Sequence, residues 1–370
     1  MSSPTTHKLV VEESDAGERL DRYLAARLPE LSRTRIQELI EVGLVLVDGK
    51  PSKGAHRLRA REKIVVDAQN RPPMRAEAES IPLDILYEDD DVIVVNKAAG
   101  MTVHAGAGNT RGTLVNALLG RGQALSRGGD ALRPGIVHRL DKETSGVILV
   151  AKNDFAHAKI SEAFRQRFVK KAYIALVEGR LKEKQGRIEL AIGRDLHRRT
   201  RMAVQRQKPG SALRANAPGG KPLGDKAPRG SGLAGNAREA RTDWRTLAEV
   251  DGTTLVEVQL HTGRTHQIRV HFSAIAHPVV GDALYGAASQ IRVGAGTGRG
   301  ASNERETVTM PALGRNFLHA ARLGFSQPRT GAWVEVRAPL PGELHEFLRK
   351  LSEVAGEDSK RIDAALVPYL

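Results

Sequence analysis

The sequence predicts an α+β protein of two domains. Apolar residues at helical spacing precede a short hairpin near the N-terminus, and Asp-Gly turns between apolar runs predict further hairpins. Segment 71–80, which contains Pro72-Pro73 and little apolar bulk, predicts a linker between the two parts. A chain of 370 residues, 40% of them hydrophobic, is long and apolar enough to build both cores.

The charge balance favours a polyanionic partner. The formal net charge is +14, which places nucleic acid ahead of the alternative, a basic enzyme with a small substrate. Cysteine is absent, which excludes disulfides, thiol catalysis and cysteine-ligated zinc, and suits the expected cytoplasmic location. No apolar run is long enough for a membrane span, and the first fifteen residues lack the apolar core of a signal peptide.

The first domain is expected over 18–70, after a disordered arm at 1–17. Leucines every four residues predict a first helix, and Ser32 is placed to cap a second one. Asp48-Gly49 predicts the turn of a hairpin. The supporting apolar positions are Leu20, Leu24 and Leu28 in the first helix, Ile36, Leu39 and Ile40 in the second, and the strands 44–47 and 63–67.

The second domain is expected over 81–350, followed by a C-terminal tail at 351–370. Two stretches rich in small, polar and charged residues, 207–240 and 287–305, predict disordered insertions. A helix after Asn153 carries Ile160, Phe164 and Phe168 at four-residue spacing, which predicts that these three side chains lie in the core. The other expected elements are hairpins 85–87/92–95 and 244–250/254–260, strands 147–150, 172–177 and 333–336, a strand near 323, a helix capped by Thr265, and a closing helix at 342–355.

The most informative stretch is the polar loop between Arg133 and Lys152. It ends in the apolar run 147–150, which reads as a buried strand that can hold reactive side chains rigid. Asp141 lies in the loop, close in sequence to the cation Arg139. Taken alone, the loop also fits a bland interpretation in which Asp141 only caps a turn or pairs with an arginine.

This loop contains the sequence His138-Arg139-Leu140-Asp141-Lys142-Glu143-Thr144-Ser145-Gly146. This sequence resembles the catalytic loop of the RluA-type pseudouridine synthases. The resemblance implies that Asp141 is catalytic. Lys171-Ala172-Tyr173 is similar to the motif whose tyrosine lies against the target base. Residues 263–271 are similar to a third motif, in which Arg269 pairs with the aspartate and Arg264 meets phosphate. The resemblance also implies a mixed, mainly antiparallel sheet with a central cleft, and no cofactor.

Further segments extend the resemblance and suggest RNA contacts. Asn96-Lys97 is similar to the family's first motif, although Ala98 stands where proline is usual. Lys97 could be a catalytic amine, but a structural and RNA-facing cation is favoured. The first domain resembles an S4 RNA-binding domain, which implies phosphate contacts, although a solvated basic face is the alternative. The expected RNA-binding residues are Arg33, Arg35, Lys50, Lys53, Lys97, His138, Arg139 and Arg264.

Three histidines, His261, His266 and His271, invite a zinc interpretation. A five-residue step turns a helix through about 500 degrees, so His266 and His271 should point in different directions. No carboxylate completes the set, and we expect no metal site.

The implied reaction breaks the N1–C1′ bond of uridine and rejoins the base through C5, after the nucleotide leaves its stack. A neighbouring arginine favours the ionised form of Asp141, which suits a nucleophile at C1′ or a base at C2′. The S4 domain, segment 104–109 and the 138–144 run resemble the branch that acts on 23S ribosomal RNA, which implies uridines in the helix 69 loop. The expected partner is large-subunit ribosomal RNA or a pre-ribosomal particle, and the expected state is a monomer. Transfer RNA, another ribosomal site, or a non-catalytic assembly factor stay open.

Overall fold

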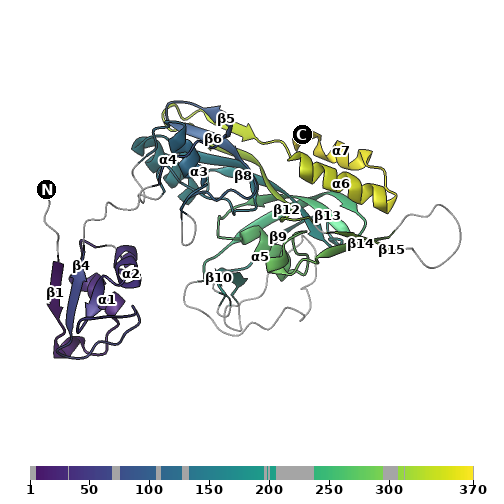
Figure 1. Cartoon of the computed structure of the whole chain (residues 1–370). Coiled ribbons are helices and arrows are strands. Elements are labelled where there is room, and N and C mark those ends of the chain that lie inside the picture. The colour runs from purple at the N-terminus through teal and green to yellow at the C-terminus, as the bar shows by residue number, and fades with distance from the viewer. Residues whose placement is uncertain are drawn as a thin grey trace. The chain divides into compact units, whose positions relative to one another are not determined.

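The computed structural model describes residues 6–31, 33–68, 76–105, 110–126, 133–195, 198, 201–205, 237–294, 307–311 and 313–369. The chain divides into two compact units, Met1–Arg75 and Ala76–Leu370 (Figure 1). Both combine helices with sheet, and the predicted α+β class is confirmed. Among the residues described, none of the helices combines the length and apolar character needed to cross a bilayer.

The N-terminal unit packs two helices against a four-stranded sheet. Helices α1 (Leu20–Arg27) and α2 (Arg33–Glu41) bury their apolar faces against the strands, because Leu20, Leu24 and Leu39 are fully buried. The sheet has the order β1-β4-β2-β3, in which the strands are β1 (Thr6–Val10), β4 (Lys63–Asp67), β2 (Val45–Val47) and β3 (Lys50–Pro51).

The expectation of a disordered arm over 1–17 is wrong for its described part. Strand β1 pairs antiparallel with β4, with Leu9 opposite Ile64, and a short 3-10 helix follows at Glu13–Asp15. The strand has alternating exposed and half-buried residues and little apolar character, so its own sequence gives a weak signal. The strand is ordered because its backbone forms hydrogen bonds to β4, which lies more than fifty residues later in the sequence. The expected cap Ser32 lies outside the described residues.

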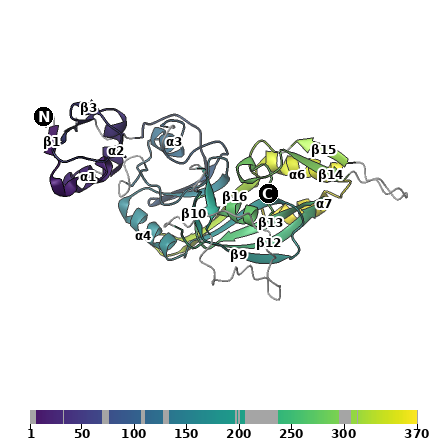
Figure 2. The ribbon, with the colours of Figure 1, turned by 90° about the horizontal axis from the view of Figure 1, so that it is seen from below.

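The second unit is built on one mixed sheet of nine strands (Figures 1 and 2). Its order is β5-β6-β7-β16-β8-β13-β12-β9, with β17 also paired to β16. The β7–β16 pair is parallel and the other pairs are antiparallel, so the sheet is mainly antiparallel as predicted. The strands are β5 (Asp84–Glu88), β6 (Val92–Lys97), β7 (Ser145–Ala151), β8 (Lys170–Glu178), β9 (Gln185–Glu189), β12 (Arg241–Val250), β13 (Thr253–Leu260), β16 (Leu318–Ser326) and β17 (Trp333–Arg337).

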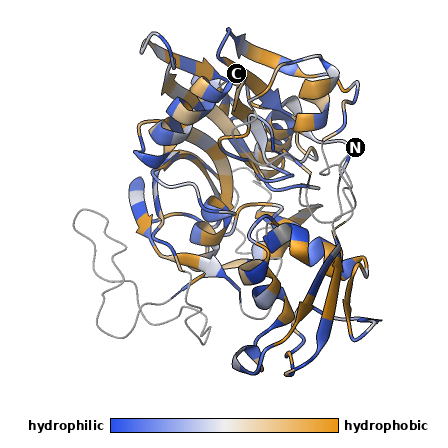
Figure 3. Ribbon diagram, turned by 90° about the vertical axis from the view of Figure 1, so that its left-hand side faces the viewer, coloured by the Kyte–Doolittle hydropathy of each residue, from blue (hydrophilic) through white to orange (hydrophobic). Residues whose placement is uncertain are grey.

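Alternating side chains place two separate cores on opposite faces of this sheet. In β7, Ile148 and Val150 join one core while Val147 and Leu149 join the other. Helix α4 (Asp154–Arg165) covers the second core, and helices α3 (Leu114–Gly120) and α6 (Gly342–Ala355) cover the first. Strands coloured mostly as hydrophobic and helices of mixed colour are visible in Figure 3. A strand buried on both faces, such as β7, can hold the loop before it firmly.

Helix α6 has the bounds that the sequence predicts, but two other expectations at the C-terminal end are wrong. Segment 351–370 is not a free tail, because helix α7 (Lys360–Leu366) and a 3-10 turn at Val367–Tyr369 bury Ile362, Leu366 and Tyr369 in the main core. Within 287–305, β14 (Gln290–Gly294) pairs with β15 (Thr307–Pro311), and Val293 is fully buried. The elements are short, and tertiary packing holds them more than local propensity does.

The other insertion, 207–240, lies mostly outside the described residues. Its described end, 237–240, is ordered by contacts. The backbone of Arg238 exchanges hydrogen bonds with Ile192 in β10 (Ile192–Arg194), which pairs with β11 (Met202–Val204), and Ala240 is buried beside Val270.

Two helix details also differ from expectation. Helix α4 ends at Arg165, so Phe168 follows it and is 63% exposed rather than in the core. Helix α5 (Gln267–Ala274) has His266 at its N-cap position with φ +56°, and Thr265 is not the cap. In both places a residue with positive φ, Arg167 or His266, changes the direction of the backbone at the helix end. Glycine is the usual residue in this conformation, and because neither position is a glycine, these helix ends had no signal in the sequence.

Candidate active site

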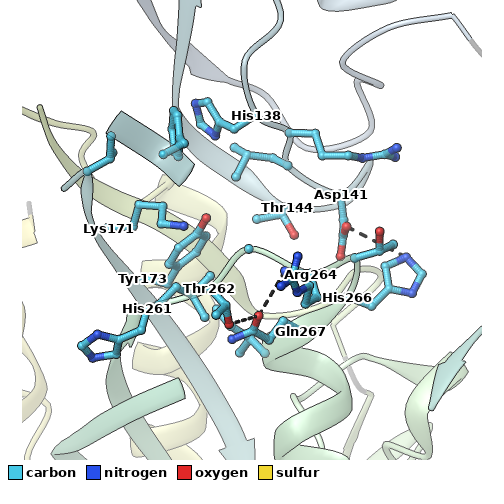
Figure 4. Close-up of a pocket in the computed structure, with 18 of the residues that line it drawn as sticks. His138, Asp141, Thr144, Lys171, Tyr173, His261, Thr262, Arg264, His266 and Gln267 are labelled. Carbon is cyan, nitrogen blue, oxygen red and sulfur yellow. Dashed lines mark hydrogen bonds and ion pairs between the residues drawn. The ribbon is translucent and has the colours of Figure 1, made fainter. Parts of the chain in front are cut away.

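A pocket of about 400 Å³ lies in the second unit where three segments of the chain meet. Its lining comes from the 137–144 loop, from the end of α4 with the first residues of β8, and from residues 260–269. The size suits a single nucleoside. The structure brings together six residues that the sequence singled out: Asp141, Tyr173, Arg269, His138, Arg139 and Arg264. Of these, Asp141, Tyr173, His138 and Arg264 are labelled in Figure 4.

The loop that carries Asp141 is anchored from outside the pocket. Arg315 is buried and donates hydrogen bonds to the carbonyl of Glu143 (2.9 Å) and the hydroxyl of Ser145 (3.1 Å). The hydroxyl of Ser145 also lies 2.9 Å from Nδ1 of His319, whose Nε2 faces the carbonyl of Ala338. Because Nε2 must donate to that carbonyl, Nδ1 accepts from Ser145. Burial lowers the pKa of His319 to about 4, so the ring is neutral at pH 7.

Close backbone packing also fixes where the loop joins β7. Gly146 has φ +110°, and a Cβ atom there would lie 2.2 Å from the carbonyl oxygen of Ala320 on the parallel strand β16. No larger residue fits, so the glycine allows the two strands to pair where the loop enters β7.

Lys97 is fully buried and supports the same loop. Its ammonium group donates to three carbonyls, those of Ala98 (2.7 Å), Met101 (2.8 Å) and Lys142 (3.1 Å). Burial lowers the pKa of Lys97 to about 7, against the opposing effect of nearby carboxylates. The expectation of an RNA-facing cation is therefore wrong, because the side chain is covered by the loop; its structural role agrees with the sequence analysis.

A continuous polar network, called the floor of the pocket, consists of three lining residues, Asp141, His266 and Arg269, and of Asp282 and Tyr285, which bond to them without lining the pocket. Arg269 donates two bonds to Asp282 (2.6 and 2.8 Å) and one to Asp141 (3.2 Å). Burial alone would lower the pKa of Arg269, but the two carboxylates, Asp282 first, hold it above its ordinary value. Arg269 is thus a fixed cation that presents the Asp141 carboxylate, itself 16% exposed, to the pocket.

His266 and Tyr285 complete the floor. The hydroxyl of Tyr285 lies 2.8 Å from Nδ1 of His266 and accepts the backbone N–H of Met202 at 3.0 Å. The hydroxyl can donate its own proton to Nδ1, and the proton of a neutral His266 is then on Nε2. That nitrogen lies 3.9 Å from Asp141 Oδ1. Burial, ahead of the opposing charge of Asp141, lowers the pKa of His266, which favours this neutral form.

Tyr173 and Lys171 form the facing wall. They are two residues apart on β8 and therefore share one face of the strand, opposite Asp141 in the view of Figure 4. Burial and then the charge of Asp141 raise the pKa of Tyr173 above its ordinary value, so the phenol stays neutral at physiological pH. Its ring can lie against a base but cannot act as a phenolate. Burial lowers the pKa of Lys171 to about 8.

His138 does not carry the charge expected of an RNA contact. Its ring packs on Phe164 with centroids 4.7 Å apart, and its Nε2 accepts the backbone N–H of Leu149 at 2.9 Å. Burial, followed by the charge of Lys171, lowers its pKa to about 3. The neutral ring is bonded to β7 and positions the loop, and because it also lines the pocket, its RNA contact stays a prediction.

Arg139 and Arg264 lie at the rim. Arg139 is exposed, and the half-buried Arg264 donates from Nε to the carbonyl of Glu239 at 3.2 Å. The loop that carries Arg264 is tied to α5 by Gln267, whose Oε1 accepts from Thr262 (2.7 Å) and from the backbone of Arg264 (3.0 Å). Both arginines can therefore reach a ligand in the pocket, and their RNA contacts stay predictions.

In the N-terminal unit, the four predicted RNA contacts remain untested. Arg33, Lys50 and Lys53 are exposed, and Arg35 lies 3.4 Å from Glu38 one helical turn away. Lys53 lines a surface hollow beside α2 and β3 together with Arg19 and Asp21.

The three histidines of the rejected zinc interpretation have separate partners. His261 faces Asp243 at 3.0 Å, His266 faces Tyr285, and His271 faces Thr242 and the carbonyl of Leu190. Across the described part of the chain, no three histidine or acidic side chains converge as metal ligands would.

The sequence analysis gave no role to Asp282, Tyr285 or Arg315. Asp282 and Tyr285 stand in the segment 281–286, where a charged and an aromatic residue flank a short turn, and this is a weak signal by itself. Asp282 lies thirteen residues after Arg269, and only the fold brings the two together. Arg315 anchors a loop more than 170 residues away, and no sequence pattern indicated that contact.

Comparisons with known proteins show which family the chain belongs to. Residues 91–274 match the family model described as RNA pseudouridylate synthase, and residues 18–64 match the S4 domain. An uncharacterized RNA pseudouridine synthase of Chloroflexus aurantiacus is 42% identical over 347 residues, which is 94% of each chain. Ribosomal large subunit pseudouridine synthase D of Nitrosomonas europaea is 38% identical over 347 residues, 94% of this chain and 88% of that one.

The corresponding protein D of Vibrio vulnificus is 36% identical over 348 residues, 94% and 95% of the two chains. Among solved structures, human RNA pseudouridylate synthase domain containing 1 is 29% identical with a TM-score of 0.48, over 71% of this chain and 85% of that one. The sequence relatives cover nearly the whole of both chains. The chain is therefore an S4-bearing member of the RNA pseudouridine synthase family.

Proposed function

We propose that this enzyme converts uridine to pseudouridine in large-subunit ribosomal RNA and that Asp141 is its catalytic residue. The observation that carries the catalytic assignment is the floor geometry: a carboxylate held 3.2 Å from a permanent guanidinium, facing a nucleoside-sized pocket. Arg269 already has Asp282 as a bidentate partner, so the Asp141 carboxylate keeps its second oxygen for the substrate.

The proposed roles follow from charge and burial. The uridine enters the pocket after leaving its stack, at a cost of a few kcal/mol. Asp141 then attacks C1′ as a nucleophile and displaces N1, or removes the C2′ proton as a base, which expels N1 and leaves a glycal. The released uracil turns, and C5 joins C1′ as Asp141 leaves C1′ or as the proton returns to C2′. The C5 proton is then lost to solvent while N1 takes up a proton. Neutral Tyr173 supplies a flat surface against the base, while Arg269 keeps Asp141 oriented.

The catalytic assignment is tested by tritium release. Total RNA labelled with tritium at uridine C5, from a strain that lacks the enzyme, should release label with wild type and at least about a thousandfold more slowly with Asp141→Asn. The substitution keeps the shape of the side chain, so folding should be retained. Equal rates from the two proteins would remove Asp141 from the chemistry.

The ribosomal target is supported by two kinds of observation. Relatives named ribosomal large subunit pseudouridine synthase D cover nearly the whole chain, and the N-terminal unit carries exposed cations suited to structured RNA. The proposed uridines are those in the helix 69 loop of 23S ribosomal RNA, where unpaired bases leave their stacks at least cost.

Mapping of pseudouridine in total RNA from a deletion strain tests this target. We expect sites to disappear from the helix 69 loop and to return with wild type but not with Asp141→Asn. Loss of sites from transfer RNA alone would refute the ribosomal target and keep the chemistry. RNA binding with no site lost would instead favour an assembly factor.

A further inference from the structure

The turn that follows α4 reaches the rim of the pocket. Arg167 and Val169 line the pocket, and the side chain of Phe168 between them is 63% exposed. Single exposed apolar residues are common on protein surfaces. Phe168 does not itself line the pocket, but it lies between two residues that do, and its exposed ring belongs to none of the hydrophobic cores.

The backbone of this turn does not suit its residues. Arg167 has φ +63°, its N–H bonds the carbonyl of Phe164 (3.2 Å), and the N–H of Phe168 bonds that of Ala163 (2.9 Å). This is the Schellman pattern, in which glycine normally occupies the left-handed position and the next residue makes an apolar contact with the helix. Here an arginine takes the strained position and the aromatic ring faces solvent, so stability alone does not explain either residue.

Positive charge also gathers at this place. Arg167 and Arg264 both line the pocket, and Arg264 is bonded to the carbonyl of Glu239, the residue that follows Arg238. Partial burial, and then the charges of Arg238 and Arg167, lower the pKa of Arg264. Within the described ranges, Arg167 and Arg238 make no ion pair, and Glu239 is the carboxylate close enough to act on Arg264. By contrast, Arg165, two residues before Arg167, is neutralised by Glu162. A cluster of like charges beside a pocket is the arrangement that an anion would stabilise.

We propose that Arg167, Phe168, Arg238 and Arg264 form a subsite for the nucleotide next to the target uridine. The three guanidinium groups bind its phosphate and the ring of Phe168 stacks on its base. When the target leaves its stack, the neighbouring base loses a stacking partner, and an exposed aromatic ring beside the pocket replaces it. Stacking on an aromatic ring tolerates any base, so this subsite contributes affinity and register rather than sequence choice.

The proposal rests on the RNA pseudouridine synthase activity and does not depend on which RNA is the target. Its two key substitutions separate binding from stability. Arg167→Gly removes the charge and also relieves the left-handed strain, so the melting temperature should be unchanged or higher while KM rises. Phe168→Leu keeps an apolar side chain of similar exposure but removes the stacking surface, and Phe168→Trp restores it.

The experiment measures tritium release from labelled total RNA of a deletion strain, so that the true substrate is present whichever RNA it is. For Arg167→Gly and Phe168→Leu we expect KM to rise about fivefold or more with kcat within twofold of wild type. Phe168→Trp should recover most of the loss. The salt dependence of KM should fall by about one unit of logarithmic slope for Arg167→Gly and should not change for Phe168→Leu.

Two matched controls lie on the same unit away from the pocket. Arg349→Gln removes an exposed charge from α6, and Phe155→Leu removes an aromatic ring, 47% exposed, from the other end of α4. Both should match wild type. KM values within twofold of wild type for Arg167→Gly and Phe168→Leu, or a fall in kcat at unchanged KM, would overturn the subsite. A target found in transfer RNA would overturn only the ribosomal assignment, because the KM comparison uses total RNA.

Discussion

The floor and the rim of the pocket differ in how completely their charges are satisfied. At the floor, each described side chain has a fixed partner, and Arg269 alone makes three charge-assisted hydrogen bonds. At the rim, defined as Arg139, Arg167, Phe168 and Arg264, side chains are exposed or half-buried and Arg167 has no described ion-pair partner. A saturated network holds geometry, whereas unsatisfied cations attract an anion. The difference predicts that floor substitutions lower kcat, that those which leave a buried group without its partner also lower stability, and that rim substitutions change KM.

The sharpest test of the floor compares two carboxylates that share one arginine. Asp282 is 3% exposed and receives two bonds from Arg269, so Asp282→Asn should lower the free energy of unfolding by about 3 kcal/mol and lower kcat through misplacement of Arg269. Asp141→Asn leaves Arg269 paired with Asp282, so stability should change by less than about 1 kcal/mol while activity is lost. Chemical denaturation and tritium release measure the two effects. Equal loss of stability in the two variants would contradict this division of roles.

The sequence predicted most of the floor and much of the fold because both leave strong local patterns. The hairpins of 84–97 and 241–260 and helix α6 follow from unbroken apolar periodicity. The sequence identified Asp141, Tyr173 and Arg269 because each lies in a distinctive sequence motif, and all three line the pocket. Their catalytic roles stay predictions until the variants are measured.

What the sequence could not predict depends on contacts between distant segments. Strand β1 and helix α7 are too short to be recognised by periodicity, and partners elsewhere in the chain stabilise them. The burial of Lys97 under the loop at Lys142 reversed the expectation that it faces RNA, and the hydrogen bond of His138 to β7 had no signal in the sequence. A basic residue in a motif looks the same in sequence whether its charge points to solvent or to backbone carbonyls.

Acid should lower the stability of the protein through His319, which helps to hold the loop that carries Asp141. His319 is fully buried and its pKa is lowered to about 4, whereas the unfolded chain binds a proton near pH 6.5. Because the unfolded state binds more protons between these values, this contribution to stability is complete above pH 6.5 and is lost as the pH falls toward 4, by up to about 1.4 kcal/mol per pH unit.

The test compares unfolding at pH 7.0 and pH 5.0 in wild type and in His319→Gln. The variant should be less stable at pH 7.0 and should show a smaller loss on acidification, because its side chain does not titrate. His7, exposed by about a fifth in the N-terminal unit, provides the control His7→Gln. An unchanged pH dependence in His319→Gln would show that another group limits acid stability.

The contact between His266 and Tyr285 should matter less than the ion pairs. Tyr285→Phe removes the hydroxyl that orients the His266 ring and leaves the N–H of Met202 without this acceptor. We expect a loss of about 1 kcal/mol in stability and roughly a tenfold fall in kcat, with KM unchanged. If the role of the Tyr285 hydroxyl is to orient the His266 ring, His266→Gln should lower kcat by a similar factor. A raised KM in either variant would place the pair with the rim instead.

The smallest expected effect belongs to Arg264, the rim residue with one backbone hydrogen bond and two arginine neighbours. Arg264→Gln should raise KM about fivefold, leave kcat and the melting temperature unchanged, and reduce the logarithmic salt dependence of KM by about one. Arg264→Lys keeps the charge and should keep the salt dependence while it loses part of the affinity, because an ammonium cannot make the bidentate contact of a guanidinium. If Arg264→Gln lowered kcat as Asp282→Asn does, the charge of Arg264 would act on the reaction itself. Arg264 would then belong to the floor and not to the rim.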